Sequence, residues 1–137
     1  MGDDDVFEKK LFNFGAPWEH NISFSQGASI RGGRLILLSG QASLDDTGNV
    51  VGKGDMALQV KTSLEAVRRG LKIAGAGPAD VVKVNIYTTD CRAFHKTQPI
   101  REAFFSKPYP AQTVVEVARL AMRDFLVEIE VTAVVND

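Results

Sequence analysis

The sequence predicts an α+β fold in which a mixed sheet carries two helices on one face. Three observations lead to this prediction. An apolar stripe of helical period runs through residues 55–74, β-like runs stand on both sides of it, and the order along the chain is strands, helix, strand, helix, strands. This order indicates a mixed sheet with both helices packed on a single face.

The N-terminal part is expected to be irregular at first and then to form a hairpin. Residues 1–21 mix charged, glycine, proline and aromatic residues, which is typical of an irregular lead-in within the same domain. Two β-like runs, 22–30 and 35–41, are separated by a short segment that holds two glycines. Because glycines supply the positive φ that tight hairpins need, we predict an antiparallel hairpin here. A turn at 45–49 then leads to a short strand at 50–51.

Two helices are predicted. In residues 55–74 the apolar side chains recur at spacings of three and four, with Asp55 as the expected N-cap and Gly75 as the expected stop. A second helix is expected to begin after Asp90 and to extend to about residue 106. Pro99 lies inside it and should kink or split it.

The remaining strands are predicted at residues 81–89, 113–120 and 125–135. In the last run, alternate residues form an almost wholly apolar set, whereas the other set is mixed. We expect the apolar set to meet the helices, and Val114, Leu126 and Val134 to lie on the second face of the sheet. Since such a face is too apolar to be left in water, an oligomer is expected to cover it.

Composition and charge limit the classes of function. The 137 residues fit one domain, and 16 Lys and Arg against 17 Asp and Glu leave a formal charge of −1, which argues against a nucleic-acid binder. A single cysteine, Cys91, and two separated histidines argue against a disulfide or a zinc site. The acidic start lacks a signal peptide's basic segment, and no apolar run reaches the roughly 20 residues of a membrane span. A soluble, cytoplasmic protein is therefore expected.

Three stretches carry a recognisable pattern. They are Ser39-Gly40-Gln41 after an apolar strand, Leu64-Glu65-Ala66-Val67 in the first helix, and residues 110–120, beginning Pro110-Ala111-Gln112-Thr113, followed by Val127-Glu128-Ile129-Glu130. Through these stretches the chain resembles the RidA family, formerly YjgF, over roughly residues 24–135. The resemblance implies a chorismate-mutase-like fold and a homotrimer with a barrel-like centre. It also implies ligand clefts between the subunits.

The resemblance also implies an activity and its residues. Active family members hydrolyse reactive enamines and imines, such as 2-aminoacrylate and 2-iminopropanoate, to 2-keto acids and ammonia without a cofactor. In them an arginine binds the substrate carboxylate, a glutamate positions the attacking water, and a tyrosine and a serine line the cleft. The glutamate corresponds to Glu128, the candidate catalytic residue, and the serine to Ser39, which stands beside Gly40.

At four positions the sequence departs from the family pattern. The cleft tyrosine corresponds to Phe24, the arginine to Gln112, an asparagine of the second helix to Gln98, and a helix tyrosine to Arg101. A guanidinium holds a carboxylate through two charge-assisted hydrogen bonds of about 1.5 to 3 kcal/mol each, whereas an amide offers about 0.5 to 1.5 kcal/mol and no charge. Small imino acids are thus expected to bind more weakly at Gln112. The sequence leaves open whether Arg101 projects toward a cleft.

Structural interpretations of these residues stay open beside the functional ones. Glu128 also fits a solvated glutamate on a surface strand, while Gln112 and Ser39 fit strand-end residues that bond to turn backbone. Three classes of function remain. The first is an enamine or imine deaminase with an altered substrate, and the second is a non-catalytic trimer that binds a metabolite or protein partner. The third, an endoribonuclease or translation inhibitor, is disfavoured by the neutral charge and the absence of paired histidines.

Overall fold

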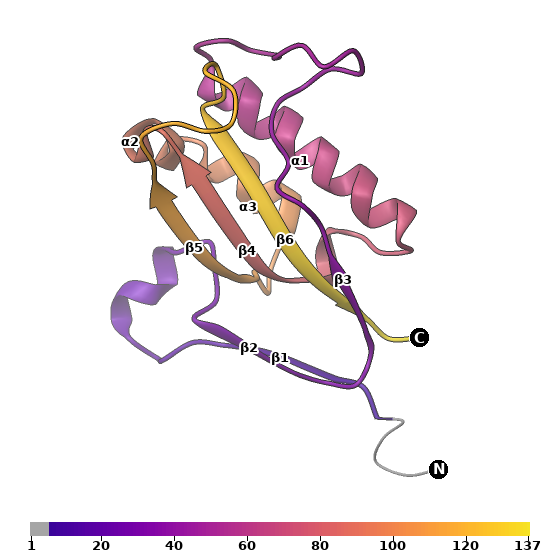
Figure 1. The fold of residues 1–137 in the computed structure, drawn as a ribbon. Helices are drawn as coiled ribbons and strands as arrows, with labels where there is room; N and C mark the ends of the chain where they lie inside the picture. Colours follow the sequence, from indigo (N-terminus) through magenta and orange to yellow (C-terminus); the bar gives the residue numbers. More distant parts are fainter. Residues whose placement is uncertain (1–5) are drawn as a thin grey trace.

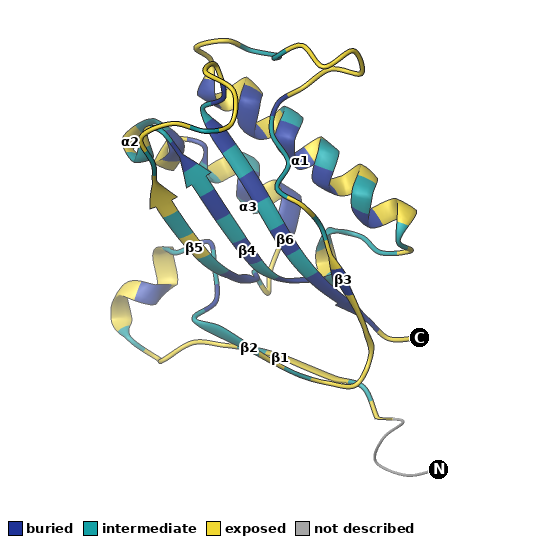
Figure 2. Ribbon diagram, in the orientation of Figure 1, coloured by how far each residue is buried: buried dark blue, intermediate teal, exposed yellow. Residues whose placement is uncertain are grey.

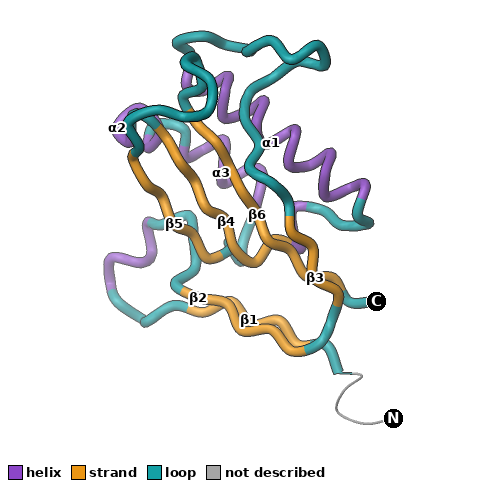
Figure 3. Tube along the Cα trace, in the orientation of Figure 1, coloured by secondary structure: helices purple, strands orange, loops and turns teal. Residues whose placement is uncertain are grey.

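A four-stranded mixed sheet, covered by helices on one face, forms the body of the computed structural model, which describes residues 6–137 (Figure 1). A separate two-stranded ribbon lies beyond one end of this sheet (Figure 3). The elements in order are β1 (Glu8–Phe12), a 3₁₀ turn (Pro17–Asn21), β2 (Gly27–Arg31), β3 (Arg34–Leu37), α1 (Met56–Ile73), a 3₁₀ turn (Pro78–Asp80), β4 (Val81–Thr88), α2 (Cys91–His95), α3 (Gln98–Phe105), β5 (Ala111–Glu116) and β6 (Val127–Val135). The predicted α+β class is confirmed.

The sheet has the strand order β3-β6-β4-β5. β6 is antiparallel to both of its neighbours, whereas β4 and β5 run parallel, with Ile86 opposite Val114. Parallel neighbours need a crossover connection, and α2 and α3 supply it. The sheet is therefore mixed, as the element order predicted.

The predicted first helix is present as α1. The Asp55 carboxylate accepts a hydrogen bond from the Leu58 N–H at 3.0 Å, which satisfies one of the free donors at the helix start. After the helix, Gly75 adopts a φ of +80°, which favours glycine. Within the apolar stripe, Val60, Leu64, Val67 and Leu71 are buried against the sheet.

The predicted second helix is split in two. Asp90 caps α2 by accepting a hydrogen bond from the Ala93 N–H at 3.0 Å. Pro99 lies in the first turn of α3, where its missing N–H has no intrahelical acceptor to lose. The prediction that Pro99 splits this helix is confirmed.

The two faces of the sheet differ in burial. Buried and less buried residues alternate along β4 and β6 (Figure 2). We call the face that bears Val84, Ile86 and Ile129, all nearly inaccessible beneath the helices, the helix face. The opposite face, which bears Leu35, Leu37 and Glu128, is called the open face.

The expected hairpin between residues 22–30 and 35–41 is wrong. β2 pairs with β1, and β3 pairs with β6 instead. Gly32 and Gly33 do adopt positive φ values of +73° and +85°, but their turn takes the chain from the ribbon into the sheet. Residues 8–12 of the expected irregular segment 1–21 form β1, and residues 1–5 of that segment lie outside the described residues.

Two other strand predictions differ from the structure. The expected strand at 50–51 is only an isolated bridge between Leu44 and Val50. The strand expected at 113–120 ends at Glu116. The Val117 N–H still donates to the carbonyl of Thr88, but Thr88 is the last residue of β4, and beyond it no strand within residues 6–137 pairs with this segment.

For the second face of the sheet, the prediction is confirmed for the position of Val134 and wrong for Val114. Val114 lies opposite Ile86 and packs, like Leu126, against the core beneath the helices. Val134 is on the open face but is buried. The exposed apolar residues of that face include Leu35, which is 61% exposed, Leu37, which is 69% exposed, and Val115, which is 41% exposed.

Candidate functional site

Glu128 lies against the backbone of the segment that follows β3. Gln41 and Ile129 exchange two backbone hydrogen bonds of 2.8 and 2.9 Å, which hold this segment beside the start of β6. As a result, a Cβ added to Gly40 would lie only 2.7 Å from Cδ of Glu128. Residue 40 must therefore lack a side chain for the carboxylate to occupy its place.

A depression of about 340 Å³ surrounds this contact. It is lined by residues 40–42, 44 and 45, by Ala66 and Arg69 of α1, and by Phe125 and Glu128. Ser39 is exposed beside it, and its backbone carbonyl accepts a hydrogen bond from Gln41 Nε2 at 3.0 Å. The structure thus brings Gly40 and Glu128 together in one depression, with Ser39 at its margin.

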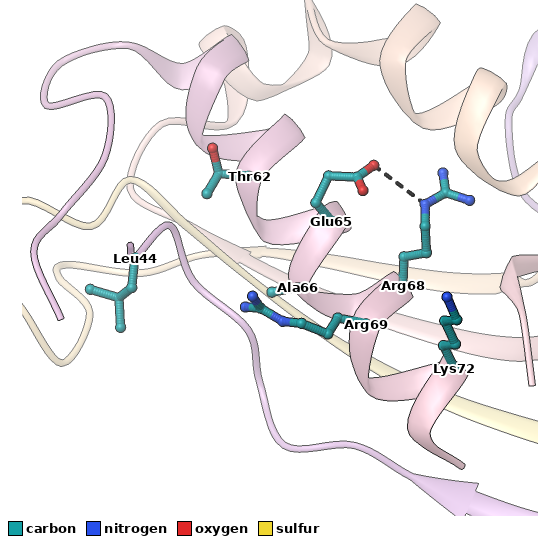
Figure 4. A pocket seen from close by; sticks show the side chains of 7 residues that line it. All are labelled: Leu44, Thr62, Glu65, Ala66, Arg68, Arg69 and Lys72. Carbon is teal, nitrogen blue, oxygen red and sulfur yellow. Dashed lines mark hydrogen bonds and ion pairs between the residues drawn. The ribbon is translucent and has the colours of Figure 1, made fainter. Parts of the chain in front are cut away.

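A second depression, of about 370 Å³, adjoins the first on the outer side of α1 (Figure 4). It shares Leu44, Ala66 and Arg69 with the first. Its charged residues are exposed: Arg68 pairs with Glu65 at 3.4 Å, and Arg69 pairs with Asp46 at 3.5 Å. Exposed pairs of this kind stabilise little, so this region is a solvated helix face.

Phe24 and Gln98 lie in a different region. Phe24 is half-buried and lines a depression of about 570 Å³ between the segment before β2 and residues 107–109. Gln98 Nε2 donates to Ser23 Oγ at 2.7 Å, and that hydroxyl donates to Glu102 Oε1 at 2.7 Å. The hydroxyl of Ser23 and the amide of Gln98 lower the pKa of Glu102. These bonds hold the segment that carries Phe24 on α3.

Gln112 belongs to this second region. The Ser25 N–H donates to the Pro110 carbonyl at 3.0 Å, which places the segment after Phe24 beside the start of β5. Gln112 is half-buried on β5, opposite Val84, so its side chain lies on the helix face. There its Oε1 accepts a hydrogen bond from Arg101 Nη1 at 3.4 Å.

A single chain does not bring the candidate residues into one cleft. Val84 lies opposite both Gln112 and Val131, and Glu128 is three residues from Val131 on β6. Side chains three residues apart on a strand point to opposite faces. Gln112 and Glu128 therefore lie on opposite faces of the sheet, with β4 between their strands.

Known proteins resemble the chain along most of its length. The family model described as endoribonuclease L-PSP matches residues 18–135. The chain belongs to this family. A RutC family protein of Pyrococcus abyssi is 39% identical over 106 residues, which are 77% of this chain and 82% of that protein. A 2-iminobutanoate/2-iminopropanoate deaminase of Escherichia coli is 36% identical over 115 residues, or 81% of this chain and 86% of that one.

Solved structures of the L-PSP family agree with the fold. The Rid family protein YyfB of Yersinia pestis, of unknown function, has a TM-score of 0.84 and 27% identity, and the match covers 93% of this chain and 98% of that one. RidA of an Antarctic Psychrobacter has a TM-score of 0.69 and 29% identity, over 84% and 90% of the two chains. The resemblance to RidA and the fold expected from it are confirmed.

Two arginines of this L-PSP family chain, Arg69 and Arg101, lie near the candidate residues. The sequence left the direction of Arg101 open, although its spacing of three from Gln98 places both on one side of α3. Arg69, which lines the depression with Glu128, was not anticipated. No local pattern signals it, because its position depends on how α1 packs against residues 40–45.

Within residues 6–137, His, Cys, Asp and Glu side chains form no group of three or more that could hold a metal ion. No helix in the same range is both long and apolar enough to cross a membrane.

Proposed function

We propose that this L-PSP family chain hydrolyses a small enamine or imine, with Glu128 as the catalytic residue, in a cleft built by two chains. The relatives from Escherichia coli and Salmonella typhimurium, named 2-iminobutanoate/2-iminopropanoate deaminases, are 36% and 34% identical, and each match covers 86% of the relative. The observation that carries the proposal is the Glu128 carboxylate seated against Gly40 inside a depression.

The carboxylate suits the chemistry of imine hydrolysis. A water molecule that donates a hydrogen bond to Glu128 is oriented for attack on the carbon of a C=N bond. The water oxygen bonds to that carbon and its proton moves to the nitrogen, which gives a carbinolamine. Loss of ammonia then leaves a carbonyl compound. An enamine enters the same sequence after protonation of its carbon gives the imine.

A second chain is part of the proposal because one chain does not bring all the candidate residues together. Gln112 lies on the helix face with Phe24 and Gln98 nearby, whereas Glu128 lies on the open face. The open face also exposes Leu35 and Leu37, which need cover. We propose a homotrimer in which this face is buried and the two groups of residues meet across the subunit boundary.

Binding without turnover is the second candidate function. It is favoured by Gln112, which stands where the resemblance expects the arginine that holds the substrate carboxylate. The third class, an endoribonuclease, is the activity for which the family is named, but a formal charge of −1 does not favour an RNA substrate.

The experiment compares wild type with Glu128→Gln. Ammonia and 2-keto acid release would be measured from freshly generated 2-iminopropanoate and 2-iminobutanoate, with sedimentation run on both proteins. We expect the variant to keep the assembly and to lose turnover by at least about a hundredfold, since the amide keeps the shape but cannot accept a proton. Equal turnover in both proteins would make Glu128 structural. Ligand binding with no wild-type turnover would support the second candidate function.

A further inference from the structure

Arg101 is a buried cation whose hydrogen bonds are incomplete. The residue is only 5% exposed, and its guanidinium carbon lies 4.3 Å from the centre of the Phe94 ring. Nη1 donates to Gln112 Oε1, but Nε is enclosed and has no acceptor. Among residues 6–137, no carboxylate forms an ion pair with Arg101.

A buried positive charge in this position would be stabilised by an anion bound beside it. Guanidinium keeps its proton in proteins, although burial lowers the pKa of Arg101. An unpaired buried charge is strongly unfavourable, and nearby Glu102 already accepts a hydrogen bond from Ser23. The structure therefore holds a desolvated cation that Glu102 stabilises from nearby but that forms no ion pair with a described carboxylate.

The free donors of Arg101 have the geometry that a carboxylate requires. Neither Nε nor Nη2 donates a hydrogen bond to a described residue, and only Nε is enclosed without a partner. The Nε–H and Nη2–H bonds point the same way along one edge of the guanidinium. Such an edge takes the two oxygens of a carboxylate through parallel, charge-assisted hydrogen bonds.

Through Gln112, Arg101 contacts the strand at the outer edge of the sheet. Gln112, the hydrogen-bond partner of Arg101, is half-buried on β5, the last strand of the sheet. The segment before β2 covers only the start of β5, through the bridge between Ser25 and Ala111. Beyond Gln112 the outer edge of β5 has no neighbouring strand within residues 6–137.

We propose that Arg101 is the anion-binding residue of this chain, held in place by Phe94 and Gln112 to receive the carboxylate of a small imino or keto acid. The inference deepens the proposed function and rests on it. It also gives Gln112 a role, because a neutral carbonyl oxygen orients Nη1 where a second arginine would repel the guanidinium. Arg69 is the less suitable cation, since it is exposed and already pairs with Asp46.

Calorimetric titration with 2-oxobutanoate tests the proposal without requiring turnover. The proteins are wild type, Arg101→Gln, Arg101→Lys, and Arg69→Gln, which removes the competing guanidinium near Glu128. We expect Arg101→Gln to weaken 2-oxobutanoate binding by about tenfold to a hundredfold and to leave binding of the uncharged 2-oxobutanamide unchanged. Arg101→Lys should be weakened less, because it keeps the charge but lacks the planar pair of donors. Arg69→Gln should weaken binding less than Arg101→Gln does.

An exchange variant sharpens the test. Arg101→Gln combined with Gln112→Arg returns one guanidinium to the same contact, so it should recover part of the lost affinity. Unchanged 2-oxobutanoate binding in a folded Arg101→Gln would overturn the proposal, as would loss in Arg69→Gln alone. If Arg101→Gln does not fold, wild-type affinity in Arg101→Lys overturns it instead. If wild type and Arg101→Gln have equal kcat/KM for 2-iminopropanoate, this inference is wrong but the proposed function stands. If wild type neither binds 2-oxobutanoate nor hydrolyses 2-iminopropanoate, the proposed function is wrong as well.

Discussion

The backbone of Gly40 and the carboxyl group of Glu128 occupy adjoining space, so that a Cβ at residue 40 would come within 2.7 Å of Cδ and 2.8 Å of Cγ of the glutamate. The contact follows from the two backbone hydrogen bonds between Gln41 and Ile129. The Glu128 carboxylate can take this position because Gly40 has no side chain.

Gly40→Ala should displace the Glu128 carboxylate at little cost in stability. The clash is with the end of a flexible side chain, which can rotate away, so unfolding in urea should show a loss below about 1.5 kcal/mol. Turnover should fall by about a hundredfold if the glutamate positions the water, because a displacement of about 1 Å has effects of this size. The control is Gly77→Ala, whose added Cβ would meet no atom within 4 Å. Full turnover in Gly40→Ala would contradict the prediction.

The open face should form the contact between subunits. Replacing Leu35 and Leu37 together by Glu places two charges on that face, and burying them unpaired is unfavourable. Sedimentation equilibrium should give about three times 14.9 kDa for wild type and one chain mass for the variant. Ile73→Glu is the control, since Ile73 is 85% exposed at the end of α1 and should change nothing. A wild type that stays monomeric at micromolar concentration would contradict the trimer and the shared cleft.

Gln59 should be essential for stability although it is polar. It is fully buried on α1, donates to the carbonyls of Gly52 and Asp124 at 3.0 and 2.9 Å, and accepts the Leu126 N–H at 2.8 Å. Gln59→Leu leaves the Asp124 carbonyl and the Leu126 N–H without the partners that Gln59 supplies, whereas the Gly52 carbonyl still accepts the Asp55 N–H, and it should lower the free energy of unfolding by about 2 kcal/mol or more. Ser63→Ala, one turn further along, removes a buried hydroxyl that has no partner and should cost far less. Similar urea midpoints for both variants would refute this assignment.

Acid should weaken the turn before the 3₁₀ segment through Glu19. Its carboxylate accepts the N–H groups of Phe14 at 3.0 Å and Ala16 at 2.6 Å, and the Phe14 bond is the main cause that lowers the pKa of Glu19 below its ordinary value of 4.5. A lowered folded-state pKa contributes stability that is present above the unfolded-state pKa and is lost as the pH falls through the folded-state value.

Trp18, the one tryptophan of the chain, stands next to Glu19 and reports on this turn by fluorescence. Wild-type emission should change as the pH falls below about 4.5, and Glu19→Gln should show a smaller change, since it has no charge to lose. Glu65→Gln on α1 serves as the control. An identical pH profile in wild type and Glu19→Gln would contradict the role of Glu19.

Local signals in the sequence determined the helices and most of the strands. The spacing of apolar residues over 55–74, with Asp55 and Gly75 at its ends, predicts α1 because helical period and capping depend on neighbours within one turn. Pro99 likewise acts on its own turn, and it splits the second helix as predicted. The motif around Glu128 led to the family by the same kind of short-range pattern.

Only the tertiary structure decided which strands pair and which side chains meet. The partner of β2 is β1 and not β3, and the register of Ile86 opposite Val114 turns Val114 and Gln112 toward the helices. A run of β-branched residues has the same local pattern whichever neighbour it pairs with, and shifting its register by one residue reverses its faces. The contact between Arg101 and Gln112 arises only when α3 folds back over β5. This contact places the positive charge of Arg101 beside Gln112.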